Sequence, residues 1–332
     1  MASLVSNAGS RGTDSPSRCV ACGSASCFVT GLLPSVLLMP SLDRITIYPV
    51  KSLDGVDVGT ATVLPGGALE HDRRWRFVDM EGRVVNAKRL AILHAVRAEF
   101  ALAERRVTLA VDPAAVAARA VPGVDRLASL AADTFPLVPG PAGPCEWVST
   151  ALGFEVLLQE RAGGGFPDDR DACGPTLVTT ESLTEVAGWY QIGLDECRRR
   201  FRVNLEVGGA DAFWEDALAC PRHPAETSRV VPRSDASIDP AADLPPAEPR
   251  PVRVGTAGFR ATNVCRRCPV PSRDSRTGAA TEWFEDIFVA RRRQGLRPDV
   301  DASHWGTFYR LAVNTVGLGD VPEGIAAGDP VT

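Results

Sequence analysis

Histidine and lysine are both scarce in this chain of 332 residues. Only four histidines occur, and no two of them stand at metal-ligand spacing, which argues against a histidine-rich zinc hydrolase. Two of the 36 basic residues are lysines, Lys51 and Lys88, and the others are arginines. A lysine retained in so arginine-rich a sequence hints at a position that needs a compact ammonium rather than a planar guanidinium. Both lysines are therefore candidate site residues.

The chain also lacks a surplus of positive charge and a long apolar run. Its formal net charge is −5, whereas a protein that binds nucleic acid by neutralising phosphates is usually basic. The apolar stretch from Phe28 to Leu38 is broken by Gly31 and Pro34 and falls short of the ~20 residues of a membrane-spanning helix. We expect no nucleic-acid partner, no membrane span and a cytoplasmic location.

Cysteine is present in an odd number and at irregular spacing, which disfavours a disulfide framework. The nine are Cys19, Cys22, Cys27, Cys145, Cys173, Cys197, Cys220, Cys265 and Cys268. With 45% hydrophobic and 23% charged residues, the bulk of the chain reads as a globular protein of about two domains. Residues 1–40 are Ser-, Gly- and Ala-rich, and we expect a disordered tail or a start codon placed too early, with Met39 as the true start.

Short alternating segments dominate the first half. Strands are expected at 44–48, 56–64 and 75–79, followed by a hairpin of 96–102 and 106–111, with short helices at 127–132 and 146–152. This spacing favours an antiparallel barrel or sandwich over a doubly wound fold. A loop of mixed charge, 161–174, separates this half from the next.

Helices and strands mix in the second half. Ser182 and Glu185 fit a capping box for a helix through Tyr190, and a second helix is expected at 194–199. The alternation predicts strands at 202–207, 252–264 and 308–315, a helix at 282–293 with a basic end, a long proline-rich loop at 221–251 and a closing segment at 325–331.

The strongest local motif is Cys265-Arg266-Arg267-Cys268, placed between a strand and a turn. A zinc site would need a second pair, and only Cys19 and Cys22 offer one. A thioredoxin-like pair should open a helix, but prolines follow. The arginines favour a thiolate that can ligate a metal, and two buried cysteines at a strand end remain an equal alternative.

Two further motifs combine cations with polar groups. Lys51 and Ser52 follow a strand, and Arg73 lies one hairpin later, so together they can hold a phosphate or form an ordinary surface cluster. Arg202 and Asn204, two residues apart on one face of the expected strand, can grip an anion and the edge of a heterocycle, or form a surface salt bridge.

In this order, the motifs resemble the MOSC family, named for the C-terminal domain of molybdenum cofactor sulfurases. The resemblance runs from about residue 41 to the end, and it rests on Tyr48–Ser52, Phe201–Asn204, Glu215-Asp216 and Cys265–Cys268 before Thr277-Gly278. No single motif is specific, but four in register over ~220 residues are. The resemblance implies a mixed α+β, β-rich fold: an N-terminal MOSC β-barrel domain at 41–165, and a MOSC β-barrel domain with peripheral helices at 170–332.

The resemblance also implies roles. Relatives such as the amidoxime-reducing component proteins bind a molybdenum pyranopterin cofactor and reduce N-hydroxylated compounds. By that likeness Cys268 would ligate molybdenum, and Asp216 would lie close to the metal and influence proton delivery. Lys51, Ser52 and Arg73 would bind the pterin phosphate, Arg202 and Asn204 the pterin, with Lys88 nearby.

Some positions depart from the family pattern. Val203 replaces a proline, and Ala172 and Cys173 stand where amidoxime reducers carry a Thr-Ser pair that contacts the phosphate. No fused four-cysteine ferredoxin-like segment is present, so electrons are expected from a separate ferredoxin, flavoprotein or cytochrome b5-type protein, and the substrate is a small molecule. Two alternatives remain: a sulfur carrier with a persulfide on Cys268, or a non-catalytic cofactor-binding protein. We expect the reductase function to be independent of pyridoxal phosphate.

Overall fold

The computed structural model describes residues 39–220 and 248–332. The expected N-terminal tail up to residue 38, Cys19 and Cys22, and most of the expected proline-rich loop lie outside the described residues. Within the described ranges, none of the helices is long and apolar enough to cross a membrane.

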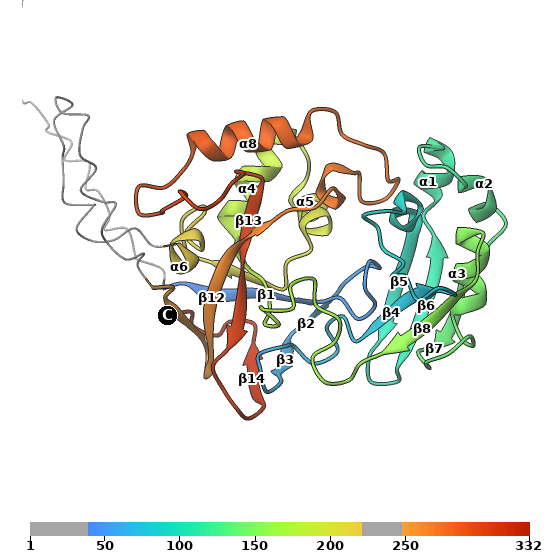
Figure 1. The fold of residues 1–332 in the computed structure, drawn as a ribbon, viewed down its shortest axis with the longest axis horizontal. Helices are drawn as coiled ribbons and strands as arrows, with labels where there is room; N and C mark the ends of the chain where they lie inside the picture. Colours follow the sequence, from blue (N-terminus) through green and yellow to red (C-terminus); the bar gives the residue numbers. More distant parts are fainter. Residues whose placement is uncertain (1–38, 221–247) are drawn as a thin grey trace, which may run out of the picture. The chain divides into compact units, whose positions relative to one another are not determined.

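A seven-stranded sheet joins the beginning of the chain to its second half (Figure 1). Its strands, in spatial order, are β11 (Pro251–Val254), β12 (Ala257–Arg266), β13 (Arg310–Gly317), β9 (Leu177–Thr179), β10 (Leu205–Gly208), β1 (Ser41–Ile47) and β2 (Val56–Val58). Strand β10 runs parallel to β9, and the other neighbours are antiparallel. Because β1 pairs with β10, the loop that follows β1 is brought to the same region as the end of the helix before β10.

The remaining strands form smaller sheets. These are β5 (Val96–Ala101), β6 (Arg106–Val111) and β7 (Asp133–Pro136); β4 (Trp75–Asp79) with β8 (Val156–Glu160); and β3 (Thr60–Val63) with β14 (Glu323–Ala326). Helices α1 (Pro113–Ala118), α2 (Val124–Leu127) and α3 (Cys145–Leu152) accompany them, and a 3-10 helix spans Ala91–Ala95. Trp75, Phe77 and Leu109 are buried in the core that these elements share.

Four helices accompany the large sheet: α4 (Thr180–Tyr190), α5 (Leu194–Phe201), α6 (Asp216–Ala219) and α8 (Phe284–Gln294), with a 3-10 helix at Val270–Ser272. In Figure 1, α4 lies near α5 and α8, with which it makes contacts. Phe201, Phe284 and Phe288 form a buried aromatic cluster with centroids 5.8–6.4 Å apart. Burial of three phenyl rings fixes the C-terminal end of α5.

The predicted mixed α+β, strand-rich fold is confirmed. The strand at 75–79, the hairpin of β5 and β6 and the helices at 146–152, 194–199 and 282–293 were predicted to within two residues, since each rests on a local pattern. The division into domains at 41–165 and 170–332 stays a prediction.

Four local predictions were wrong. The single strand predicted at 252–264 is the antiparallel hairpin of β11 and β12, with a turn at Gly255 and Thr256. The strand predicted at 202–207 begins at Leu205, because Arg202 is the C-cap of α5, with φ of 55° and its amide donating to the carbonyl of Arg198. The helix cap is Thr179, which accepts from the amide of Ser182, so Ser182 lies inside the helix. The helix predicted at 127–132 spans Val124–Leu127.

Candidate functional site

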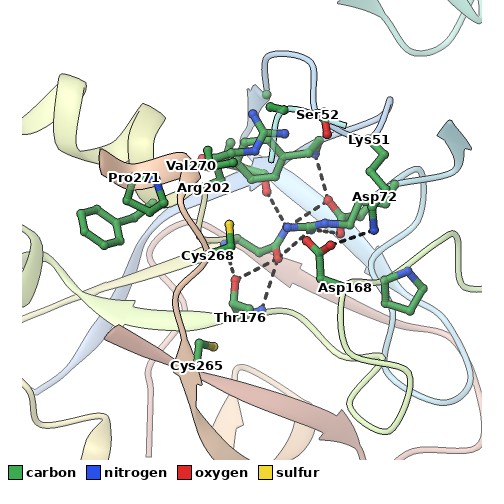
Figure 2. A pocket seen from close by; sticks show the side chains of 18 of the residues that line it. Lys51, Ser52, Asp72, Asp168, Thr176, Arg202, Cys265, Cys268, Val270 and Pro271 are labelled. Atoms are coloured by element: carbon green, nitrogen blue, oxygen red, sulfur yellow. Dashed lines mark hydrogen bonds and ion pairs between the residues drawn. The ribbon is translucent and has the colours of Figure 1, made fainter. Parts of the chain in front are cut away.

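A cavity of about 850 Å³ lies where the loop after β1, the loop between β8 and β9, the end of α5 and the segment after β12 meet. Seven of the eight predicted site residues line it: Lys51, Ser52, Arg73, Lys88, Arg202, Asn204 and Cys268. In Figure 2, Lys51 and Ser52 lie towards the upper right of the view, and Arg202 and Cys268 lie nearer its middle. Ligand cavities of 300–1,000 Å³ are typical for cofactors and small molecules, so the size suits either.

Lys51 and Lys88 lie at one end of the cavity, which we call the lysine end, and both contact the carboxylate of Asp168. The Nζ of Lys51 lies 2.8 Å from Oδ1 of Asp168 and also donates to the carbonyl of Phe166 at 3.1 Å. Lys88 lies 3.5 Å from the same carboxylate oxygen. Partial burial raises the pKa of Asp168, but the charges of Lys51, Arg73 and Lys88 outweigh it and hold this pKa well below its ordinary value. Burial lowers the pKa of Lys51, and Asp168 partly offsets that effect.

Arg73 is fixed by a network that ends on Asn204. Its guanidinium is paired with Asp72 and donates to Oδ1 of Asn204 at 3.2 Å. The amide nitrogen of Asn204 donates to the carbonyl of Thr46 and to Asp72, both at 3.0 Å, and its oxygen also accepts from Thr176. Both donors of Asn204 are thus committed inside the protein, so this residue positions Arg73 and does not present a free edge to a heterocycle.

Arg202 differs from the other cations of the cavity. Within the described residues, its guanidinium makes neither a hydrogen bond nor an ion pair, and it lies over the Tyr48 ring, 4.3 Å from the centroid. Burial lowers the pKa of Arg202, and the neighbouring charge of Arg73 lowers it further. An arginine with free N–H groups facing a cavity is the group best prepared to accept an anion there.

The two cysteines of the Cys-Arg-Arg-Cys motif have different environments (Figure 2). Cys265 is buried, its thiol donates to Oδ1 of Asn314 at 2.9 Å, and burial raises its pKa to about 11. Cys268 is half-buried and lines the same cavity. Of the two, Cys268 is therefore the thiol available to a ligand, and Cys265 is a protonated packing residue.

Cys173 also lines the cavity, half-buried, with its thiol donating to the carbonyl of Arg170 at 3.3 Å. Ala172, the other departure from the family pattern, is buried beside it. Among the residues that the structure describes, no three His, Cys, Asp or Glu side chains gather as a metal site of their own.

Asp216, the eighth predicted site residue, does not line the cavity. It is 1% exposed in its side chain, and its Oδ2 lies 2.5 Å from Nη2 of Arg292, which is fully buried on α8. Beside it, Glu215 accepts from Ser182 and Thr179, and burial together with the charge of Asp216 raises its pKa to about 8. The pair Glu215-Asp216 thus belongs to a buried polar cluster.

Asp168 and Thr176 belong to the site but were not identified from the sequence. Asp168 lies in the mixed-charge loop, and the sequence signal available was the presence of two lysines that need a counter-ion. Thr176 is one residue before β9, and its hydroxyl both donates to and accepts from Asn204, a pairing between residues 28 positions apart. No local pattern encodes that contact.

Comparison with known proteins gives two findings. Residues 39–138 match the family model of the MOSC N-terminal beta barrel domain. Molybdenum cofactor sulfurases of Drosophila melanogaster and Drosophila ananassae are each 28% identical to this chain, over 198 and 210 residues. These matches cover 54% and 56% of the chain and 25% and 26% of the relatives, so the chain matches about a quarter of their length. Both findings agree with the motifs in the sequence.

Proposed function

Since the chain belongs to the MOSC-domain family, we propose that it binds a molybdenum pyranopterin in this cavity and reduces N-hydroxylated small molecules there. The observation that carries the proposal is the joint presence, on the wall of one cavity, of an accessible thiol, Cys268, and of Arg202, which has no hydrogen-bond or ion-pair partner among the described residues. A thiolate suits molybdenum alongside the pterin sulfurs, and the arginine suits an anionic group.

The residues present fit such a cofactor. A phosphate would be bound by the Lys51 ammonium and by Arg73, since both residues line the cavity. Ser52 lies beside them with φ of 72°, a strained conformation for a non-glycine residue that places its backbone on the cavity wall. In the part of the chain that the structure describes, Arg202 is the cation of this set that has neither a hydrogen bond nor an ion pair.

In this proposal the reaction consumes two electrons and two protons, converts an N–OH group into N–H and releases water. When bound, the molybdenum centre supplies the two-electron exchange and the affinity for oxygen. The chain's own contribution is to bind and orient: Cys268 anchors one end of the cofactor and the cationic residues anchor the other. The electrons come from a separate protein of ferredoxin, flavoprotein or cytochrome b5 type.

Turnover tests the reductase proposal. Protein from a host that makes the cofactor is supplied with benzamidoxime and a chemical reductant, and formation of benzamidine is measured. The wild type is expected to turn over, and Cys268→Ser to lose at least 100-fold in kcat, whereas Cys265→Ser keeps most of it because that thiol is buried. A wild type that binds the cofactor but gives no benzamidine contradicts reductase activity and leaves a cofactor-binding module.

Sulfur transfer is the second candidate, and the names of the relatives favour it, since they are molybdenum cofactor sulfurases. Cys268 would carry a persulfide, because it is the half-buried thiol of its pair. Mass spectrometry after incubation with a sulfur donor distinguishes the two functions. A persulfide on Cys268 without bound metal supports the carrier, and an unmodified thiol with bound molybdenum supports the reductase.

A further inference from the structure

At the lysine end of the cavity, the chain itself supplies an anion, the carboxylate of Asp168. The carboxylate of Asp168 lies 2.8 Å from the Lys51 ammonium and 3.5 Å from that of Lys88. Among the described residues, these two lysines are its only hydrogen-bond or ion-pair partners. A ligand phosphate that binds Lys51 must therefore share the lysine with Asp168 or displace it.

The two carboxylates near Arg73 differ in how firmly they are held. Asp72 accepts from the amide of Tyr48 at 2.9 Å and from Asn204 at 3.0 Å, in addition to pairing with Arg73, and its side chain is 12% exposed. Asp168 is 54% exposed, and its partners among residues 39–220 and 248–332 are two flexible lysine side chains. Of the two, Asp168 is the carboxylate that a side-chain rotation can remove from the cations.

We propose that Asp168 sets the affinity and the charge selectivity of the anion site at Lys51, because its carboxylate occupies the place on the lysine ammonium that an oxygen of the ligand takes. The inference deepens the proposed function and rests on it. It makes Asp168 an internal competitor, whose single negative charge offsets part of the charge of the two lysines until a ligand anion enters.

Charge selectivity follows from the local arithmetic. Lys51, Lys88 and Arg73 face Asp72 and Asp168, so the cluster has a net charge of about +1 with both acids ionised. A dianion such as a phosphate monoester feels twice the repulsion from Asp168 that a monoanion feels. Replacing Asp168 by a neutral residue should therefore raise the affinity for a dianion by the square of the factor by which it raises the affinity for a monoanion.

The test uses the full chain expressed in a host that does not make the cofactor, titrated with sulfate and with nitrate at constant ionic strength and followed by NMR. Asp168→Asn is expected to bind sulfate about tenfold tighter than the wild type and nitrate about threefold tighter. The control is Asp195→Asn, which removes the same charge from the wall of the same cavity but is paired with Arg198, not with the lysines. It should change both affinities by less than about twofold.

A larger increase in affinity for sulfate than for nitrate indicates that Asp168 competes through its charge. A purely structural role of Asp168 would change both affinities alike. The proposal is overturned if Asp168→Asn binds sulfate no tighter than the wild type, or if sulfate and nitrate gain equally. Asp168→Ser must give the same pattern, which guards against an effect of the amide itself. The proposed function is tested by a different result. If protein made in a host that produces the cofactor contains no molybdenum, the proposed function is wrong, but the conclusion from the sulfate titration is unaffected.

Discussion

Replacing Arg292 with methionine is expected to lower the free energy of unfolding by about 3–5 kcal/mol. The guanidinium is fully buried, 2.5 Å from the carboxylate of Asp216, and also donates to the carbonyl of Arg310 at 3.1 Å. Methionine keeps an apolar stem but loses the guanidinium, whose Cζ lies 4.0 Å from the centroid of the Phe213 ring, and it leaves the Asp216 carboxylate without its cation in a site that is 1% exposed. The loss of the counter-charge dominates, because desolvating an unpaired carboxylate costs several kcal/mol.

Denaturant unfolding at pH 7 measures the effect, with Arg293→Met as the matched control. Arg293 is the next residue on α8 and is exposed, so its loss should cost less than about 1 kcal/mol. Adding Asp216→Asn to Arg292→Met should recover at least ~1 kcal/mol, since the stranded charge is then removed. A loss below about 1 kcal/mol for Arg292→Met, or no recovery in the double variant, would refute this account of the cluster.

Three further outcomes follow from the same contacts. Burial raises the folded pKa of Glu215 to about 8 from an ordinary value of 4.5, so stability should fall as pH rises through this window, by up to about 1.4 kcal/mol per pH unit. Glu215→Gln should reduce the dependence of the free energy of unfolding on pH. Denaturant unfolding of both proteins at pH 5 and pH 8 measures it, and an equal change in the wild type and the variant would contradict the prediction. Gly67→Ala should lower the free energy of unfolding by about 3 kcal/mol, because the added Cβ would overlap the backbone of Gly317. Gly66→Ala, at a similar positive φ but in open space, should lower it by about 1 kcal/mol. Comparable losses in the two variants would exclude the steric explanation. Arg202→Gln should weaken sulfate binding about tenfold in an NMR titration and leave the melting temperature within a few degrees, since the guanidinium loses its contact with the Tyr48 ring but has no hydrogen bond or ion pair to lose among the described residues. Unchanged affinity would remove Arg202 from the anion site.

The parts of the fold that depend on local patterns could be predicted from the sequence. The alternation of β4 and of the β5–β6 hairpin is contained within a few residues, and so is the amphipathic pattern of α3. The pairing of β1 with β10 joins residues about 160 positions apart, and nothing in either segment specifies the partner. The start of β10 was misplaced for a related reason: Arg202 alternates like a strand residue but caps the helix α5.

The candidate site also contains residues that short motifs identify and residues whose role depends on contacts distant in the sequence. Lys51 and Cys268 were identified because each lies in a short motif with its own chemistry, and both line the cavity. Asp216 also lies in a motif, yet its direction is set by Arg292, 76 residues away, and it faces the interior. Asp168 was missed because it is one of three aspartates in the mixed-charge loop 161–174, and only the positions of the lysines distinguish it from the other two.

Molybdenum content tests the central claim most directly. The full chain and two variants, Cys268→Ala and Cys265→Ala, are expressed in a host that makes the cofactor, purified, and analysed for metal and pterin. The account predicts about one molybdenum and one pterin per chain in the wild type and in Cys265→Ala, whose thiol is buried against Asn314, and little molybdenum in Cys268→Ala. A wild type without molybdenum, or a Cys268→Ala variant that retains it in full, would contradict the account.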